Sequence, residues 1–212
     1  MISKANCGCR RKSAQPPQPL PSHSLALPNL LTYGRIAAVP AVVGCMYWQS
    51  LHGGDALRWV ALVIFIAAGV TDVLDGYFAR MWGQQSSFGR MLDPIADKLL
   101  VASCLLMLAA DGTIYGLWLF ASIVILCREI LVSGLREYLA ELRVSVPVTR
   151  LAKWKTTLQL VAIGFLLAGD AGDAIVPVVT PIGLSLLLLS ALLTLYTGWD
   201  YFRAGVRHLI AD

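Results

Sequence analysis

Charged side chains are scarce in this sequence. Asp, Glu, Lys and Arg make up 14% of the 212 residues, whereas 57% are hydrophobic and the mean hydropathy is +0.68. In soluble domains, about a quarter of the residues are charged and about half are apolar. The composition therefore argues against a soluble globular domain and indicates a helical membrane protein.

The five cysteines lack the patterns that a disulfide framework or a zinc site requires. Cys45, Cys104 and Cys127 lie inside apolar segments, where cysteine usually acts as a small hydrophobic residue. Cys7 and Cys9 have no matching second pair, so no zinc site is expected. The net charge of +4 does not predict a nucleic-acid partner, because the basic residues fall mostly between apolar segments.

The first 27 residues have too few apolar side chains to build a packed core. They are rich in Pro, Ser and basic residues, as in "CRRK" and "PPQPLP", and predict a disordered tail lying against anionic lipid on the cytoplasmic side. The charged region, apolar stretch and cleavage site of a secretory signal do not occur in that order. We expect the folded domain to occupy residues 28–208.

Six long apolar segments follow the tail. Each covers roughly the 20 residues that span a bilayer, and the first is near the short limit. The start of the first segment, "LPNLLTYGRI", could instead form a short amphipathic helix at the membrane interface. Turn-forming stretches such as "HGGD" and "GDAGD" separate the segments. The expected segments are 31–48, 57–81, 92–110, 113–140, 151–168 and 176–201.

Basic residues occur in alternate connections between these segments. The connections near residues 51–57, 111–116 and 169–176 contain no Lys or Arg, and Arg58, just beyond the first, is the sole exception. The positive-inside rule therefore places both termini in the cytoplasm, which agrees with an even number of spans. The expected fold class is an all-α integral membrane protein with six transmembrane helices.

Four aspartates interrupt the apolar pattern at the cytoplasmic ends of the second and third spans. Asp72 and Asp75 are three residues apart in "TDVLDGYFAR", and Asp93 and Asp97 are four apart in "LDPIADK". Each pair therefore shares one face of its helix. Two connected helices would direct all four carboxylates to one place at the level of the inner leaflet.

Single members of this set also have purely structural interpretations. Asp93 before Pro94 is typical of a helix N-cap. Four converging carboxylates would nevertheless repel one another strongly, and divalent ions relieve that repulsion directly. Oxygen ligands without His or Cys suit Mg²⁺ or Mn²⁺. For two aspartates the alternative is an ion pair with a nearby cation, Asp75 with Arg80 and Asp97 with Lys98.

The full pattern over residues 72–97, D-x2-D-G-x2-A-R-x8-G-x3-D-x3-D, resembles the signature of the CDP-alcohol phosphotransferase family. The resemblance implies that family's six-span fold and, in most members, a homodimer. It implies an enzyme that moves a phosphatidyl or similar group from a CDP-linked donor to an alcohol and releases CMP. It also implies two ions, Mg²⁺ or Mn²⁺, held by Asp72, Asp75, Asp93 and Asp97, with Asp97 as general base.

The resemblance further implies where the CDP-linked donor binds. The two glycines of the pattern let a nucleotide approach the helices closely, and its arginine can pair with a phosphate. The first segment contributes matching residues as well. The expected donor-binding residues are Asp72, Gly76, Ala79, Arg80 and Gly89, together with Asn29, Thr32 and Arg35.

Basic residues of the fourth and fifth segments are the candidates for binding an anionic acceptor. Arg128 lies deep in an apolar helix, and its neighbour Glu129 is not expected to face it, because adjacent helical residues point in different directions. Other basic residues there have a simpler interpretation as topology signals. The candidates for the acceptor phosphate are Arg128, Arg136, Lys153 and Lys155.

Four stretches resemble one branch of the family, the phosphatidylglycerophosphate synthases of bacteria: "PNLLTYGRI", "LDPIADKLLVA", "REILVSGLRE" and "KWKTT". This resemblance covers roughly residues 28–205. It implies CDP-diacylglycerol as donor, sn-glycerol 3-phosphate as acceptor, and a site facing the cytoplasm at the bacterial inner membrane. The alternative acceptors are inositol phosphate, serine and phosphatidylglycerol. A divalent-cation transporter is disfavoured, because the carboxylates lie at one end of the membrane and no inverted repeat is evident.

Overall fold

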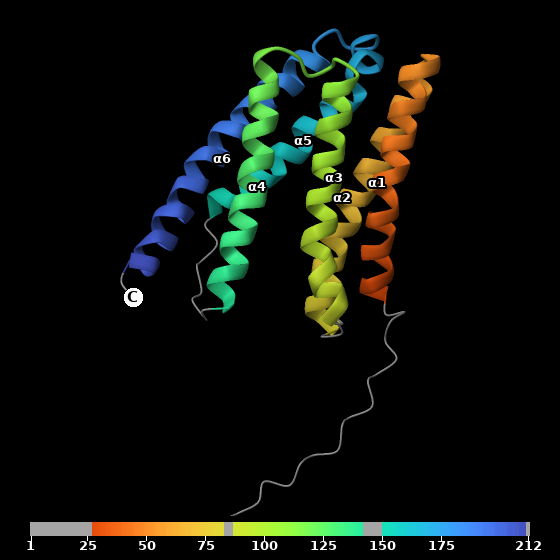
Figure 1. Ribbon diagram of the computed structural model, residues 1–212. Coiled ribbons are helices and arrows are strands. Elements are labelled where there is room, and N and C mark those ends of the chain that lie inside the picture. The colour runs from red at the N-terminus through yellow and green to blue at the C-terminus, as the bar shows by residue number, and fades with distance from the viewer. Residues whose placement is uncertain (1–26, 83–86, 142–149, 211–212) are drawn as a thin grey trace, which may run out of the picture.

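The computed structural model describes residues 27–82, 87–141 and 150–210, and within these ranges it contains six α-helices and no strands (Figure 1). Each helix overlaps one predicted segment, so the all-α fold class is confirmed. The tail predicted over residues 1–27 lies outside the described residues except for Leu27. The helices are α1 (Leu27–His52), α2 (Ala56–Trp82), α3 (Ser87–Ala110), α4 (Leu117–Glu141), α5 (Arg150–Asp173) and α6 (Val179–Ile210).

Helices α1 and α3 begin several residues earlier than the sequence predicted. The stretch "LPNLLTYGRI" forms the first turns of α1 rather than a separate interfacial helix. Helix α3 begins at Ser87, so the N-cap interpretation of Asp93 was wrong, and both Asp93 and Pro94 lie inside the helix. Proline in a helix removes the bond to the carbonyl four residues earlier. For Pro94 that carbonyl belongs to Arg90, in the first turn, where losing one bond disturbs little of the helix.

The outer surface of the bundle is apolar. Large hydrophobic side chains such as Val63, Leu106 and Phe120 are mostly exposed on different helices. Contiguous apolar surface of this kind marks contact with lipid or with another protein. By length and composition, two stretches among the described residues can cross a membrane, Leu117–Leu139 and Val179–Trp199. These features support a membrane protein, and the number of six spans stays a prediction.

Exposed aromatic side chains gather toward both ends of the helices. Trp and Tyr favour the two interfaces between membrane and water, where their rings lie among the lipid headgroups. The exposed Trp and Tyr side chains lie at two levels, one toward each end of the bundle. Toward the end where α1 and α3 finish lie Tyr47, Trp48, Trp59 and Tyr115, and toward the other end lie Tyr33, Tyr138, Trp154, Tyr196 and Trp199.

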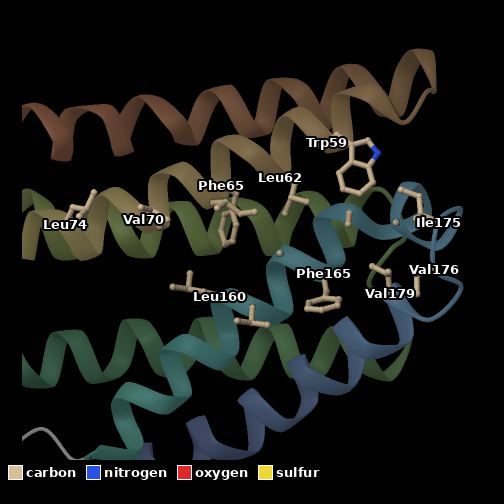
Figure 2. Close-up of a pocket in the computed structure, with 16 residues that line it drawn as sticks. Trp59, Leu62, Phe65, Val70, Leu74, Leu160, Phe165, Ile175, Val176 and Val179 are labelled. Atoms are coloured by element: carbon tan, nitrogen blue, oxygen red, sulfur yellow. The ribbon is translucent and has the colours of Figure 1, made fainter.

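An apolar groove of about 710 Å³ runs between α2 and α5 and reaches the start of α6 (Figure 2). Trp59 and Leu74 mark its two ends on α2, and Leu160 and Phe165 line it from α5. Gly164 helps to keep it open, because the nearest atom to a Cβ at that position would be Cδ1 of Leu62 at 3.8 Å. The groove therefore extends along the bundle and ends two residues from Asp72.

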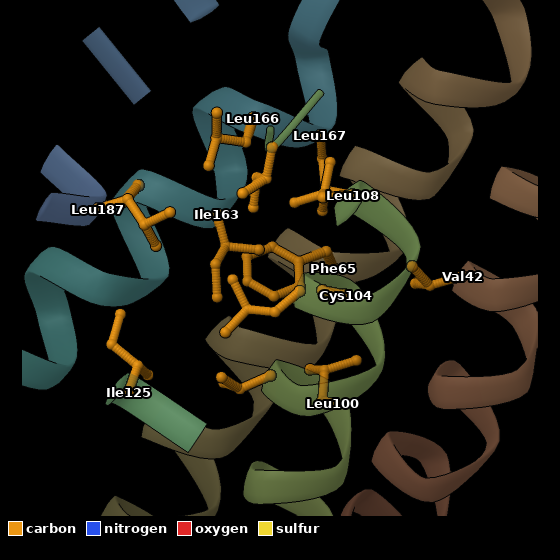
Figure 3. Close-up of a cluster of buried hydrophobic side chains, with 14 of the residues drawn as sticks. Val42, Phe65, Leu100, Cys104, Leu108, Ile125, Ile163, Leu166, Leu167 and Leu187 are labelled. Atoms are coloured by element: carbon orange, nitrogen blue, oxygen red, sulfur yellow. The ribbon is translucent and has the colours of Figure 1, made fainter. Parts of the chain in front are cut away.

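The core lies where α2, α3 and α5 meet (Figure 3). Phe65, Cys104 and Ile163 come from these three helices and are buried together. Where helices lie in lipid, close van der Waals packing of this kind holds them together. The core thereby fixes α2 and α3, which carry the four aspartates, relative to each other.

A buried arginine joins α2, α5 and the turn that follows α3, at the end of the bundle opposite the aspartates. Arg58, at the start of α2, is 3% exposed, and its Nη2 lies 3.2 Å from Asp111 Oδ2. Its guanidinium donates hydrogen bonds to the carbonyls of Leu166 (3.3 Å) and Leu167 (3.2 Å) on α5. These carbonyls precede a kink at Gly169, where φ is 43° and ψ is −131°. We call this set of contacts the Arg58 cluster.

Candidate active site

The candidate site begins where α2 and α3 meet α1. Arg35 of α1 is almost fully buried, and its Nη1 lies 2.7 Å from Asp72 Oδ1 and 3.7 Å from Asp93 Oδ1. One guanidinium nitrogen is therefore shared by carboxylates of two different helices. The sequence predicted that carboxylates of α2 and α3 converge, and Asp72 and Asp93 do so at Arg35.

Helix α1 holds Asp93 through a second contact. The hydroxyl of Thr32, one turn before Arg35, donates a 2.8 Å hydrogen bond to Asp93 Oδ1. Thr32 and Arg35 are both buried, whereas Asp72 is about half-exposed. Thr32 and Arg35 thus orient the carboxylates, while Asp72 remains accessible from outside the bundle. Donor binding by Thr32, Arg35 and Asp72 stays a prediction.

Asp97 lies one helical turn beyond Asp93 and faces a separate space. It lines a cavity of about 450 Å³ between α3, α4 and α5, which we call the polar cavity. Lys98 lines the same cavity and donates a 2.5 Å hydrogen bond to Ser133 of α4. The remaining polar lining residues are Glu129, Glu137, Thr156 and Gln159.

Two of the predicted acceptor-binding cations meet at one carboxylate. Lys155 of α5 is buried and forms an ion pair with Glu129. Arg128 Nη1 lies 3.5 Å from Glu129 Oε1, and Arg128 Nη2 donates to the hydroxyl of Thr197 on α6 at 3.2 Å. The expectation that Arg128 and Glu129 do not pair was wrong, because the long arginine side chain bends back to its neighbour. Arg136 is exposed.

Several predicted site residues lie in the helices, but their side chains fall outside the described part of the structure. For these, the structure gives only the helix that carries them. Among the side chains that the structure describes, no group of three or more His, Cys, Asp or Glu residues is arranged to hold a metal ion. Asp75 is not among those side chains. The residues are Asn29 on α1, Asp75, Gly76, Ala79 and Arg80 on α2, Gly89 on α3 and Lys153 on α5.

The sequence analysis did not single out Gln159, a polar residue of α5 that is buried inside the bundle. It is the only polar residue between Thr157 and Asp170 apart from glycine, in an otherwise apolar run of α5. A lone polar residue in such a run usually faces the bundle interior for a reason. That signal was present in the sequence. The pairing of Glu129 with Lys155, by contrast, depends on how α4 and α5 pack, which no sequence spacing reveals.

Known proteins resemble this chain over most of its length. A protein of Rickettsia bellii named CDP-diacylglycerol–glycerol-3-phosphate 3-phosphatidyltransferase is 44% identical over 178 residues, 84% of this chain and 94% of that protein. A protein of the same name from Cereibacter sphaeroides is 38% identical over 87% of this chain and 97% of its own length. A protein of Oryza sativa named cardiolipin synthase (CMP-forming) is 39% identical over 92% of this chain and 61% of its own length.

The family comparison covers the same region as the site. The model of the CDP-alcohol phosphatidyltransferase family matches residues 25–196, which include α1 to α5 and most of α6. All four aspartates fall within this match, as do Thr32 and Arg35, which contact Asp72 and Asp93. The chain therefore belongs to the CDP-alcohol phosphatidyltransferase family.

Proposed function

We propose that this protein transfers the phosphatidyl group of CDP-diacylglycerol to sn-glycerol 3-phosphate, giving phosphatidylglycerophosphate and CMP. The observation that carries the proposal is the meeting of Asp72 and Asp93 at Arg35, with Asp97 one turn away in the polar cavity. Family membership and the printed names of the Rickettsia and Cereibacter relatives support the same reaction.

The four aspartates suit two hard divalent ions, Mg²⁺ or Mn²⁺. All their donor atoms are carboxylate oxygens, and the carboxylates of Asp72 and Asp93 already share one cation, the guanidinium of Arg35. Asp75 and Asp97 complete the proposed ligand set. When bound, such ions neutralise the donor phosphates and orient the attacking and leaving oxygens.

The chemical step needs one proton acceptor. The acceptor's primary hydroxyl oxygen forms a bond to the lipid-side phosphorus of CDP-diacylglycerol, and the bond from that phosphorus to the bridging oxygen of CMP breaks. CMP leaves with the bond's electron pair. We assign Asp97 to take the hydroxyl proton, because it lies one helical turn beyond Asp93 and lines the polar cavity.

Cations beside the polar cavity are the proposed partners of an anionic acceptor. Arg128 and Lys155 both pair with Glu129, so two positive charges meet at one carboxylate there. Guanidinium and ammonium groups can bind the phosphate of glycerol 3-phosphate. We propose Arg128 and Lys155 as its principal partners, with Arg136 and Lys153 nearer the aqueous phase.

We place the donor-binding residues around the half-exposed carboxylate of Asp72. Arg80 on α2 is the proposed partner of a donor phosphate, since guanidinium groups pair well with phosphate. Thr32 and Arg35 act mainly by holding the aspartates in place. Gly76, Ala79, Gly89 and Asn29 complete the proposed nucleotide site on α1, α2 and α3.

We further propose that the chain has a cytoplasmic tail over residues 1–27 and a six-span domain over residues 28–208. The two levels of exposed Trp and Tyr support this placement in a membrane. Both termini then face the cytoplasm of a bacterial cell, and the site opens at the inner leaflet. A homodimer is the proposed assembly, on the basis of the family resemblance.

A panel of acceptors tests the proposed reaction. Purified protein with CDP-diacylglycerol and Mn²⁺ should release CMP when glycerol 3-phosphate is added, and chelation by EDTA should stop the release. Release with serine or inositol phosphate instead would contradict the acceptor assignment. Release with phosphatidylglycerol would favour the activity named for the Oryza relative. Metal flux into liposomes without any nucleotide would favour a transporter.

The apolar groove is the proposed site for an acyl chain of the donor. Replacing Gly164 with leucine should fill part of it and raise the KM for a long-chain donor about tenfold, since about two displaced methylenes are worth about 1.4 kcal/mol. The KM for dioctanoyl donor, whose chains stop short, should change little. The matched control is Gly44→Leu on α1, where a new Cβ also has free space. Equal effects on both donors would contradict this use of the groove.

A further inference from the structure

Helix α6 holds the guanidinium of Arg128 in place. Arg128 Nη2 donates a 3.2 Å hydrogen bond to Oγ1 of Thr197, and Arg128 Nη1 lies 3.5 Å from Oε1 of Glu129. One terminal nitrogen is therefore held by α6 and the other by α4, the helix that carries the arginine. None of the residues that the sequence predicted for the site belongs to α6, so this contact gives α6 a part that the sequence did not indicate.

The hydroxyl of Thr197 is itself fixed. It donates to the backbone carbonyl of Leu193 at 2.9 Å, and the carbonyl of Thr194 lies 3.3 Å away. A hydroxyl has a single proton, so with that proton committed to α6 its oxygen can only accept a hydrogen bond from Arg128. Thr197 is 2% exposed. The oxygen is therefore a preset acceptor, directed at the arginine and shielded from water.

The next residue, Gly198, gives the stem of Arg128 its room. A Cβ at this position would lie 3.1 Å from Cγ and 3.5 Å from Nε of Arg128. Because glycine has no Cβ, the stem can lie directly against the α6 backbone. Thr197 and Gly198 thus fix the charged end and the stem of the same side chain.

Holding an arginine before its ligand arrives favours binding. A free arginine side chain loses rotamer freedom when it is immobilised, and that loss weakens the binding of any ligand that must order it. Without the hydroxyl of Thr197, the Arg128 guanidinium would lose its partner on α6 and could follow the carboxylate of Glu129. The Thr197 contact keeps it in one place instead.

We propose that Thr197 is a positioning residue for the acceptor, holding the Arg128 guanidinium where the acceptor phosphate binds. This inference rests on the proposed function, in which Arg128 binds that phosphate. Thr197 acts through Arg128 and touches neither substrate. The acceptor phosphate is unchanged by the reaction, so Arg128 binds it equally before and during the chemical step. Loss of positioning should therefore raise the KM for the acceptor and leave kcat nearly unchanged.

The test is Thr197→Val, which keeps nearly the same shape and removes the hydroxyl. The KM for glycerol 3-phosphate should rise about tenfold, as expected for losing one hydrogen bond to a charged group. The values of kcat and of KM for CDP-diacylglycerol should change little. Thr197→Ser retains the hydroxyl and should restore the wild-type KM. Initial rates of CMP release over a range of glycerol 3-phosphate concentrations measure all three quantities.

The matched control is Thr194→Val, one turn earlier on α6. Thr194 is also fully buried, and its Oγ1 has no hydrogen-bond partner among the described residues. Its KM for glycerol 3-phosphate should equal that of wild-type protein. Gly198→Ala serves as a second variant in case Thr197→Val folds poorly, because the added Cβ pushes the stem of Arg128 and should raise the same KM.

A double variant separates action through Arg128 from a general effect on packing. If Thr197 works by holding Arg128, Thr197→Val should raise the KM no further in protein that already carries Arg128→Met. Two residues that act through one interaction are not additive in this way, whereas independent effects on packing add.

Two results would overturn the inference while leaving the proposed reaction intact. One is a wild-type KM for glycerol 3-phosphate in Thr197→Val. The other is an equal rise from Thr197→Val with and without Arg128→Met. A wild-type KM in Arg128→Met would instead overturn the assignment of Arg128 to the acceptor phosphate. Wild-type protein that releases CMP only with another alcohol overturns the proposed function itself, and the acceptor panel identifies that case separately.

Discussion

Asp97→Asn should reduce CMP release by about 10³- to 10⁴-fold, the upper range for loss of a general base. Asparagine has nearly the shape of aspartate, but it cannot take a proton and carries no charge for a divalent ion. Asp97 lines the polar cavity rather than a tightly packed core, so the substitution should leave the helices in place. Initial rates at saturating acceptor and donor measure the effect.

Two controls separate chemistry from folding in that experiment. Thermal unfolding of Asp97→Asn in detergent should match wild-type protein within a few degrees. Asp55→Asn removes an exposed carboxylate just before α2, away from the site, and should leave the rate unchanged. If Asp97→Asn turns over at the wild-type rate, Asp97 has no part in the mechanism, and the base must be sought elsewhere in the cavity.

Arg58→Met should have the largest effect on stability, about 3–5 kcal/mol, because it breaks a buried ion pair from one side. Asp111 is only 6% exposed and would lose the cation beside it. The carbonyls of Leu166 and Leu167 would lose their side-chain donor at the kink of α5. Denaturant unfolding followed by circular dichroism measures the loss.

The same cluster contains its own control. Asp170 lies 3.8 Å from Arg58 Nη1 but is 88% exposed, so Asp170→Asn should cost no more than about 1 kcal/mol. The double variant Arg58→Met/Asp111→Leu should recover part of the stability, since it removes both charges together. Equal stability of Arg58→Met and wild-type protein would show that the cluster contributes nothing.

The helices and the position of the aspartates could be predicted from the sequence. Apolar runs fixed where each helix lies, and the spacing of Asp72 and Asp93 on neighbouring helices predicted their convergence, which the structure confirms at Arg35. The predicted fifth segment ended at residue 168, next to the kink at Gly169. The sequence therefore predicted an interruption close to Gly169, but α5 continues beyond the kink to Asp173.

Contacts between helices account for what the sequence did not predict. The sequence analysis treated Arg58 as an exception to the charge pattern. In the structure Arg58 is buried and bonds to Thr113 and Leu167, which follow it by 55 and 109 positions in the chain. No periodicity reveals partners at such separations. Helical periodicity also gave the wrong prediction for Arg128 and Glu129, which pair. It describes the direction in which a side chain leaves the backbone, and it does not say where the charged end of a long side chain lies. Asp93 followed by Pro94 fits both a helix start and a helix interior.

The Arg58 cluster also bears on how the protein is made. Arg58 Nη2 also donates a 2.7 Å hydrogen bond to the hydroxyl of Thr113. A ribosome delivers Arg58 to the membrane long before these partners, because Thr113 follows 55 residues later and Leu167 follows 109 residues later. Until α5 arrives, the nascent chain carries an arginine whose partners are incomplete. A chain that stops short of α5 therefore leaves the Arg58 guanidinium without the carbonyls of Leu166 and Leu167.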